Sequence, residues 1–297
     1  MSAAVALVTA RPARGLDEDL PLLLTAFAAA GARAEIADWD DPNVDWARFD
    51  LALLRSAWDY TERLTQFLAW VERTAASTLL LNPEPVVRWS ADKHYLQSLA
   101  AAGMPIVATA FAEPGAEARE VLRQFLAGHP CEELVVKPAV GAGARDTRRH
   151  AGAATAEILA HMGELLDERR SLMLQPYYQG VDTHGETALI FIAGRFSHAI
   201  RKGPLLPAGA PASAALFAPE QITVRVPGAD ELAVGERVLG QLRFGELLYA
   251  RVDLIRDEHG HPCVLELELA EPSLFFSYAP PSAARFAAAA LARLAAR

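Results

Sequence analysis

The sequence lacks the features that mark secreted, disulfide-bonded or membrane proteins. Its two cysteines, Cys131 and Cys263, lie far apart and without the spacing of metal ligands. This argues against a disulfide framework and fits a reducing compartment. No apolar run approaches the length of a membrane-spanning helix, and the first apolar run is too short for a signal peptide. We therefore expect a cytoplasmic protein with no membrane partner.

Two common nucleotide-binding motifs are also missing. The chain contains no Gly-x-x-x-x-Gly-Lys sequence, and Asp146 stands where a dinucleotide fingerprint would need its third glycine. A dinucleotide-dependent dehydrogenase is therefore disfavoured. The formal net charge of -9 is spread along the chain instead of being gathered in blocks. This distribution disfavours nonspecific nucleic-acid binding.

The 297 residues are enough for two or three compact units. Short aliphatic runs alternate with helical patterns over residues 1–88, which is typical of a parallel βαβ domain. Residues 89–171 are expected to form a central domain that begins with a helix capped by Asp92. Residues 172–297 are rich in candidate antiparallel strands. The predicted fold class is α/β with α+β character, in three domains.

The strongest chemical signal is a pair of predicted strands that carries three acidic residues. A turn between His259 and Gly260 would place Asp253 opposite Glu266. Glu268 lies two residues beyond Glu266, so the three carboxylates would share one face. Carboxylates gathered in this way repel one another unless a cation joins them, and hard oxygen ligands suit Mg²⁺. The alternative is a solvated acidic strand face.

A second signal is a buried strand that ends in Lys137 and leads into a loop with Gly141 and Gly143. Small residues let backbone N–H groups approach phosphate oxygens, and a lysine supplies a point charge. Lys93, at the start of a helix, is a further candidate for phosphate binding. Taken alone, the loop is equally well an ordinary surface loop, and Lys93 an ordinary solvated lysine.

A third signal is the segment LMLQPYYQGVD, in which a strand ends in Gln175 and a polar, aromatic turn carries Asp182. Such a segment offers hydrogen bonds to an adenine ring and a carboxylate to ribose hydroxyls. A plain hairpin is an equally good local account. The strand pair that follows delivers Arg201 and Lys202.

In their order along the chain, these signals resemble the pattern of ATP-grasp enzymes. The resemblance covers nearly the whole sequence, with an N-terminal βαβ domain, a central lid domain and a C-terminal domain that holds the metal carboxylates. It implies that the loop at 139–147 closes over ATP. The residues that it assigns to ATP are Lys93, Lys137, Gly141, Gly143, Gln175, Tyr177, Tyr178 and Asp182.

The same resemblance implies catalytic roles for Lys137, at the ATP phosphates, and for Arg201, at the transferred phosphate or the substrate carboxylate. It implies that Asp253, Glu266 and Glu268 hold two Mg²⁺ ions, for which Mn²⁺ can substitute. One position departs from the family: many members read Glu-x-Asn where this chain has Glu-Leu-Glu at 266–268. The extra carboxylate affects the details of the second metal site.

Within the superfamily, three blocks resemble the group of cyclo-ligases that close O-ureido-D-serine to D-cycloserine. They are WDDPNVDWARFDLALLRSAWDY, NPEPVVRWSADKHYL and LELELAEPSLFF. The resemblance implies an ATP-dependent ligase that converts a carboxylate to an acyl phosphate for attack by nitrogen. The alternatives are an intermolecular amide or peptide ligase acting on another amino acid, and an ATP-binding sensor without turnover.

The candidates for substrate recognition follow the third predicted strand, at the edge where open α/β sheets bind ligands. They are Arg55, Ser56 and Asp59, together with Arg251 from the C-terminal domain. The expected substrate is a small amino-acid-like molecule. The alternative is a capped strand-to-helix turn with Trp58 packed in the core. A homodimer is left open by the sequence.

Overall fold

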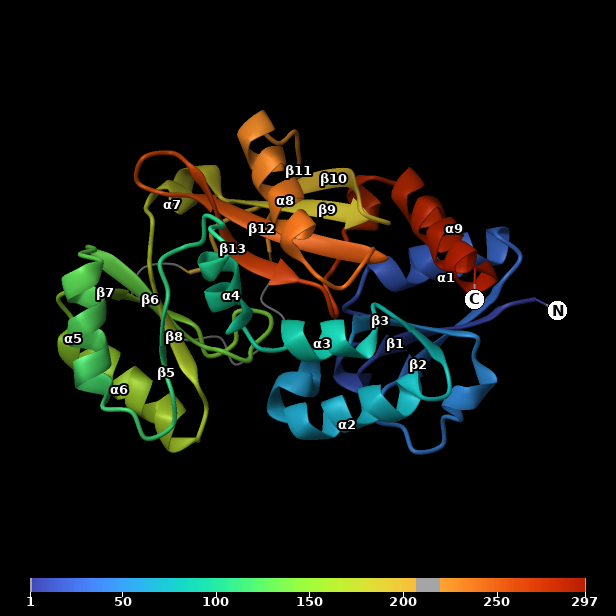
Figure 1. Cartoon of the computed structure of the whole chain (residues 1–297), viewed down its shortest axis with the longest axis horizontal. Helices are drawn as coiled ribbons and strands as arrows, with labels where there is room; N and C mark the ends of the chain where they lie inside the picture. Colours follow the sequence, from blue (N-terminus) through green and yellow to red (C-terminus); the bar gives the residue numbers. More distant parts are fainter. Residues whose placement is uncertain (1, 207–219, 297) are drawn as a thin grey trace.

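The N-terminal part of the chain folds around a parallel four-stranded sheet with the strand order β2-β1-β3-β4. The structure is a computed structural model that describes residues 2–206 and 220–296 (Figure 1). The strands are β1 (Ala4–Thr9), β2 (Arg33–Asp38), β3 (Leu51–Ser56) and β4 (Leu79–Leu81). Helices α1 (Asp19–Ala29) and α2 (Leu64–Ala75) pack on opposite faces of the sheet. Because both faces are covered, β1 and β3 are buried throughout.

The central sheet is antiparallel and has the order β5-β8-β6-β7. Its strands are β5 (Ala110–Ala112), β6 (Glu133–Pro138), β7 (Arg148–Ala151) and β8 (Leu172–Pro176). Helices α5 (Ala118–Gly128) and α6 (Thr155–Asp167) share its hydrophobic core. The sequence analysis placed residues 172–176 in the C-terminal domain, but β8 pairs with β5 and β6. The residue pattern of an apolar segment predicts a strand but not the sheet that the strand joins. The sequence therefore did not show that residues 172–176 belong to the central sheet.

The C-terminal sheet is also antiparallel, in the order β11-β10-β9-β12-β13. Its strands are β9 (Glu186–Ile192), β10 (Arg195–Lys202), β11 (Ile222–Arg225), β12 (Tyr249–Arg256) and β13 (Pro262–Glu268). One face packs against α4 (Tyr95–Ala101) and α8 (Ala229–Gln241), and the other joins the core of α1 and α9 (Pro281–Ala295). The parallel and antiparallel sheets confirm the predicted fold class.

The hairpin of β12 and β13 pairs Asp253 with Glu266, as predicted. The route differs from the expected one. The pairing next to the turn runs from Arg256 opposite Pro262 to Leu254 opposite Val264, and the register then shifts between Leu254 and Asp253. This bulge adds one residue to β13 and brings Asp253 level with Glu266.

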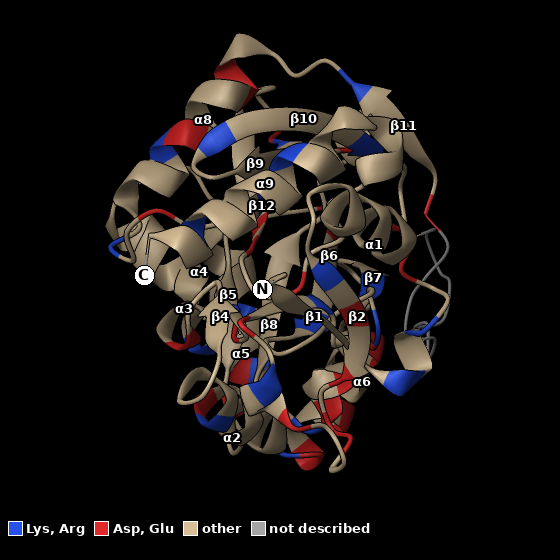
Figure 2. Ribbon diagram, turned by 90° about the vertical axis from the view of Figure 1, so that its right-hand side faces the viewer, with Lys and Arg blue, Asp and Glu red and all other residues tan. Residues whose placement is uncertain are grey.

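Shorter elements connect the sheets. They are α3 (Glu84–Ser90), α7 (Gly180–His184) and 3₁₀ helices at Arg11–Ala13, Trp46–Arg48, Trp58–Glu62 and Phe276–Tyr278. Lys and Arg positions are interspersed with Asp and Glu positions around the molecule (Figure 2). Within the described ranges, no helix combines the length and apolar character needed to cross a bilayer.

The segment after β13 is tied to the N-terminal sheet by a buried carboxylate. Asp19 accepts hydrogen bonds from the backbone N–H groups of Leu274, Phe275 and Phe276 at 2.6, 3.1 and 2.8 Å. The Arg55 guanidinium lies 3.6 Å from Asp19 and donates to the Pro272 carbonyl oxygen at 2.6 Å. These contacts fix the backbone of a segment whose apolar side chains, Leu274 and Phe276 among them, are buried in the core.

Replacing Asp19 with alanine is expected to lower the free energy of unfolding by about 3 kcal/mol, because three backbone N–H groups and a buried guanidinium lose their acceptor. Urea unfolding followed by circular dichroism measures the change. Glu18→Ala is the control, because the neighbouring Glu18 is exposed. Equal stability of the two variants would contradict this role for Asp19.

Candidate active site

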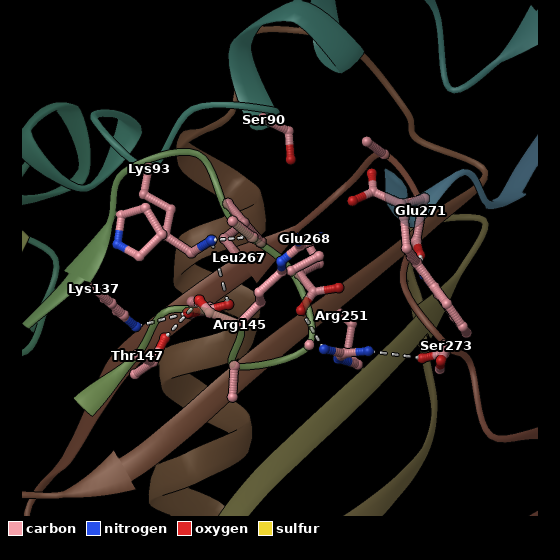
Figure 3. Close-up of a pocket in the computed structure, with 18 of the residues that line it drawn as sticks. Ser90, Lys93, Lys137, Arg145, Thr147, Arg251, Leu267, Glu268, Glu271 and Ser273 are labelled. Atoms are coloured by element: carbon pink, nitrogen blue, oxygen red, sulfur yellow. Dashed lines mark hydrogen bonds and ion pairs between the residues drawn. The ribbon is translucent and has the colours of Figure 1, made fainter. Parts of the chain in front are cut away.

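Two neighbouring cavities lie where the central and C-terminal sheets face each other, and the first also reaches the N-terminal unit (Figure 3). They share part of their walls, notably Lys137, Thr147, Glu266 and Glu268. We call them the substrate cavity and the nucleotide cavity, after the ligands that the sequence analysis expects at their lining residues. The substrate cavity is lined by Trp58, Tyr60, Lys93, Arg251, Glu271 and Ser273 besides the shared residues. The nucleotide cavity adds Val135, Gln175, Tyr177, Tyr178, Lys202, Ile255 and Leu265.

The three predicted metal carboxylates lie at this junction, and each has a basic partner. Asp253 accepts from Lys202 Nζ at 2.5 Å and from Arg251 Nε at 2.9 Å. Glu266 accepts from Lys137 Nζ at 2.7 Å. Glu268 is paired with Arg251. The charge repulsion expected from the sequence is therefore relieved by basic side chains of the protein.

The pKa values of these acids show the balance between burial and charge. Burial opposes ionisation of Glu266, but the charges of Lys137 and Lys93 outweigh it and hold the pKa of Glu266 at about 2. Burial is likewise outweighed at Asp253, whose pKa is lowered by Arg251 and Lys202. At Glu268 burial prevails over the attraction of Arg251, and the pKa is raised.

No three His, Cys, Asp or Glu side chains in the described ranges are gathered closely enough to hold a metal ion. The donor chemistry nevertheless fits a hard cation, because Asp253 and Glu266 face each other across the hairpin and Glu268 follows two residues later. A metal ion at this face would take over contacts that Lys137, Lys202 and Arg251 now make.

The glycine loop follows β6, and Gly141 and Gly143 line the substrate cavity. Lys93 ties the loop to the turn before α4: its Nζ donates to the Gly141 carbonyl oxygen at 2.6 Å, and its backbone N–H donates to the Ala139 carbonyl oxygen at 3.0 Å. Gly143 has φ +62°, a conformation that favours glycine. The structure thus brings Lys93, Lys137 and the loop together, as the sequence analysis expected.

The nucleotide cavity is largely apolar away from the carboxylates. Gln175, Tyr177 and Tyr178 line it, as expected. Asp182 is not among the lining residues. It accepts hydrogen bonds from the Tyr177 hydroxyl at 2.6 Å and from Arg149 at 3.1 Å, and the Arg149 guanidinium lies over the Tyr177 ring. Asp182 therefore supports the wall of the cavity, and its assignment to the ribose stays a prediction.

Arg201 also lies outside both cavities. Its guanidinium donates to the carbonyl oxygens of His184 and Thr183 at 2.7 and 3.1 Å. The neighbouring Lys202 is the side chain that enters the nucleotide cavity. Successive residues of a strand point to opposite faces, so Lys202 faces the cavity and Arg201 does not, and the catalytic role expected of Arg201 stays a prediction.

Three of the four substrate candidates are structural. Arg55 is fully buried, and Ser56 hydrogen-bonds the Thr9 hydroxyl at 2.7 Å. Asp59 accepts from Trp39 Nε1 at 2.8 Å and pairs with Arg63. They form the buried strand-to-helix turn that was the alternative, although Trp58 does line the cavity. The remaining candidate, Arg251, lines the substrate cavity.

Comparison with known proteins agrees with this arrangement. Residues 5–82 match the family model for the N-terminal domain of D-cycloserine synthetase DcsG. Over 307 residues the chain is 40% identical to the cycloserine biosynthesis protein DcsG of Streptomyces lavendulae, covering 98% of both proteins. This chain belongs to the DcsG family of ATP-grasp ligases. The crystal structure of D-cycloserine synthetase DcsG matches 98% of this chain and 100% of its own with a TM-score of 0.93 at 39% identity.

More distant structures share the fold. The ATP-grasp ligase PsnB matches with a TM-score of 0.66 at 18% identity, covering 98% of this chain and 99% of its own. The D-alanine–D-alanine ligase of Bacillus anthracis matches with a TM-score of 0.65 at 12% identity, covering 99% and 97%. The predicted ATP-grasp fold is confirmed, and the family membership makes the chain a carboxylate–amine ligase.

The sequence analysis missed several residues of the site. Glu186 lies opposite Lys202 in the pairing of β9 with β10 and lines the nucleotide cavity. Burial raises the pKa of Glu186 to about 7, against the attraction of Lys202. Tyr60 and Glu271 line the substrate cavity. Strand alternation separates Lys202 from Arg201 but does not show which of them faces the cavity. Tyr60 lies in a short 3₁₀ helix and Glu271 lies after the last strand, so neither belongs to a strand pattern.

Arg201 and Lys202 form a matched pair for testing the site. Lys202→Met is expected to slow ATP-dependent ADP release by about 100-fold, because a buried cation facing the carboxylates is lost. Arg201→Met is expected to change the rate less than about threefold, at a stability cost of about 1 kcal/mol for its exposed hydrogen bonds. A coupled ADP assay measures both rates. A larger loss in Arg201→Met would support its predicted catalytic role.

Proposed function

We propose that this protein uses Mg-ATP to convert the carboxylate of O-ureido-D-serine to an acyl phosphate, and that the substrate's own nitrogen then displaces phosphate to form the ring of D-cycloserine. The observation that carries the proposal is the full-length similarity to a cycloserine biosynthesis protein, joined to a cavity pair whose chemistry suits the two reactants. The alternative is an intermolecular ligase that acts on another amino acid.

The lining residues of the nucleotide cavity suit the chemistry of ATP. At one end, Val135, Ile255 and Leu265 offer apolar surface to a purine ring, while Gln175 and Tyr178 offer polar groups beside it. At the other end, Lys137 and Lys202 stand beside the carboxylates. We assign the purine to the first end and the phosphates to the second. Lys93 and the glycine loop then cover the phosphates from the substrate side.

The charged residues suit phosphoryl transfer between two anions. This reaction depends on alignment and charge neutralisation more than on covalent help from the protein. Lys93, Lys137, Lys202 and Arg251 come from four separate segments and converge on one face of the hairpin. Arg251 lines the substrate cavity, and we assign it to the substrate carboxylate, where negative charge develops as the carbonyl is attacked.

We assign two Mg²⁺ ions to Asp253, Glu266 and Glu268. When bound, Mg²⁺ supplies neutralisation of phosphate charge. Glu268 stands where many ATP-grasp enzymes have asparagine, and it keeps an ionisable oxygen donor at this position. Burial raises the pKa of Glu268, so ionisation of this carboxyl is favoured by a nearby cation.

An intramolecular nucleophile belongs to the same molecule as the carboxylate, so the reaction needs no separate binding site for an amine. We assign no such site in the two cavities. A tethered nitrogen reaches effective concentrations up to about 10⁵ M or more when well oriented. The nitrogen of O-ureido-D-serine that closes the ring carries a carbamoyl group. Hydrolysis of this group after closure gives D-cycloserine and carbamic acid, which decomposes to carbon dioxide and ammonia. The proposed route therefore passes through a carbamoyl precursor and ends at D-cycloserine, and the two compounds differ in mass.

Glu266→Gln tests the phosphate end of the site. We expect ATP-dependent product formation to fall at least about 100-fold, roughly 3 kcal/mol in the transition state, because a carboxylate that faces Lys137 becomes neutral without a change in volume. Product is measured by mass spectrometry, with circular dichroism as the check on folding. The exposed Glu157→Gln is the matched control. Full activity of Glu266→Gln would remove the carboxylate face from the mechanism.

The substrate assignment is tested by mass spectrometry of reactions with O-ureido-D-serine and Mg-ATP, with and without added free amines. We expect D-cycloserine, or its carbamoyl precursor, together with ADP and phosphate, at a yield that the added amines do not change. A dipeptide and ADP formed from an added amino acid, with no ring formed from the ureido compound, would establish the intermolecular ligase instead.

A further inference from the structure

Two carboxyl groups that line the substrate cavity, those of Glu220 and Glu271, have no ion-pair partner among the described residues, and Glu271 is the more deeply buried of the two. Glu271 lies in the segment after β13, lines the cavity and is only 8% exposed. Its neighbours Glu266 and Glu268 are ion-paired with Lys137 and Arg251. No Lys, Arg or His nitrogen of residues 2–206 or 220–296 lies within 4.0 Å of the Glu271 carboxylate. A buried acid of this kind is costly unless a ligand supplies the missing charge.

The position of Glu271 is fixed by the N-terminal unit. Trp58 Nε1 donates to the Glu271 carbonyl oxygen at 3.1 Å, and Arg55 holds the next carbonyl oxygen, that of Pro272. The Tyr60 side chain lies beside the carboxyl group and lowers its pKa. In Figure 3, Glu271 and Ser273 lie on one side of the cavity, Lys93, Lys137 and Thr147 on the other, with Glu268 between them.

The pKa of Glu271 is the one expected of a buried carboxyl group with no cation bound to it. Burial and the charge of Glu268 raise the pKa of Glu271 to about 8, against the opposing effects of Tyr60, Lys93 and Arg251. Lys93 is engaged with Gly141 and Arg251 with Asp253 and Glu268. Neither cation is within ion-pair distance of Glu271, so the attraction that they exert does not overcome burial.

We propose that Glu271 is the subsite for the α-ammonium group of the substrate, so that the cavity selects α-amino acids over plain carboxylic acids. The inference rests on the proposed function, which places the substrate carboxylate at Arg251. An α-amino acid carries an ammonium and a carboxylate on one carbon atom, and this cavity presents a free carboxyl and a guanidinium on its walls. Ser273 and Tyr60 complete the polar surface around Glu271.

The test compares the binding of two ligands to two forms of the protein. O-ureido-D-serine and its deamino analogue, 3-(ureidooxy)propanoic acid, are titrated by calorimetry into the unmodified protein and into Glu271→Gln, with Mg²⁺ and a non-hydrolysable ATP analogue present. We expect the unmodified protein to prefer the amino compound by about 10- to 100-fold, the effect of one charged hydrogen bond. Glu271→Gln should lose that preference and bind the deamino compound unchanged. Glu157→Gln is the control and should keep the preference.

The outcomes separate this subsite from the proposed function. Equal affinities of the two ligands for the unmodified protein overturn the subsite, whether or not the variant folds. A preference retained by Glu271→Gln, or an equal loss of both ligands in it, also overturns the subsite. If the unmodified protein discriminates between the ligands but releases no ADP from Mg-ATP with either, the proposed function fails and the subsite stands. Binding of neither ligand overturns both proposals.

Discussion

The site is built around the cost of burying like charges together. Asp253, Glu266 and Glu268 lie on one face of the hairpin, and the strand pairing holds them close to one another. Such an arrangement folds only when basic side chains reach it. Lys137 comes from β6, Lys202 from β10 and Arg251 from β12. The need to neutralise one strand face therefore draws the central and C-terminal sheets to the same place.

The N-terminal unit contributes through the backbone of the segment that follows β13. Asp19, Arg55 and Trp58 hold its N–H and carbonyl groups. A loop positioned by hydrogen bonds from another unit places its side chains as firmly as a strand does. For this reason residues that touch no part of the cavity, Asp19 and Arg55 above all, still determine where Glu271 stands.

The sequence allowed a prediction wherever the alternation of residues within one strand and a turn next to it were sufficient. The hairpin that sets Asp253 opposite Glu266 follows from strand alternation and a turn, and the lysine with its glycine loop follows from a buried strand that ends in a charge. Arg201 was assigned through the family resemblance, and the strand period alone does not say whether Arg201 or Lys202 faces inward. Arg55 was assigned to the substrate because it follows the third strand, at the edge where open α/β sheets bind ligands. The contacts that bury it lie more than two hundred residues away.

The two cavities share Glu266 and Glu268 in their common wall, and this couples the proposed reactants electrostatically. A cation bound at this wall would compete with Lys137 for Glu266 and with Arg251 for Glu268. Arg251, once released from Glu268, would gain freedom to meet a substrate carboxylate. Loss of the charge of Glu268 to a cation would in turn weaken the repulsion that raises the pKa of Glu271. A cation bound at the shared wall would therefore favour an ionised Glu271, and with it the proposed binding of an ammonium group.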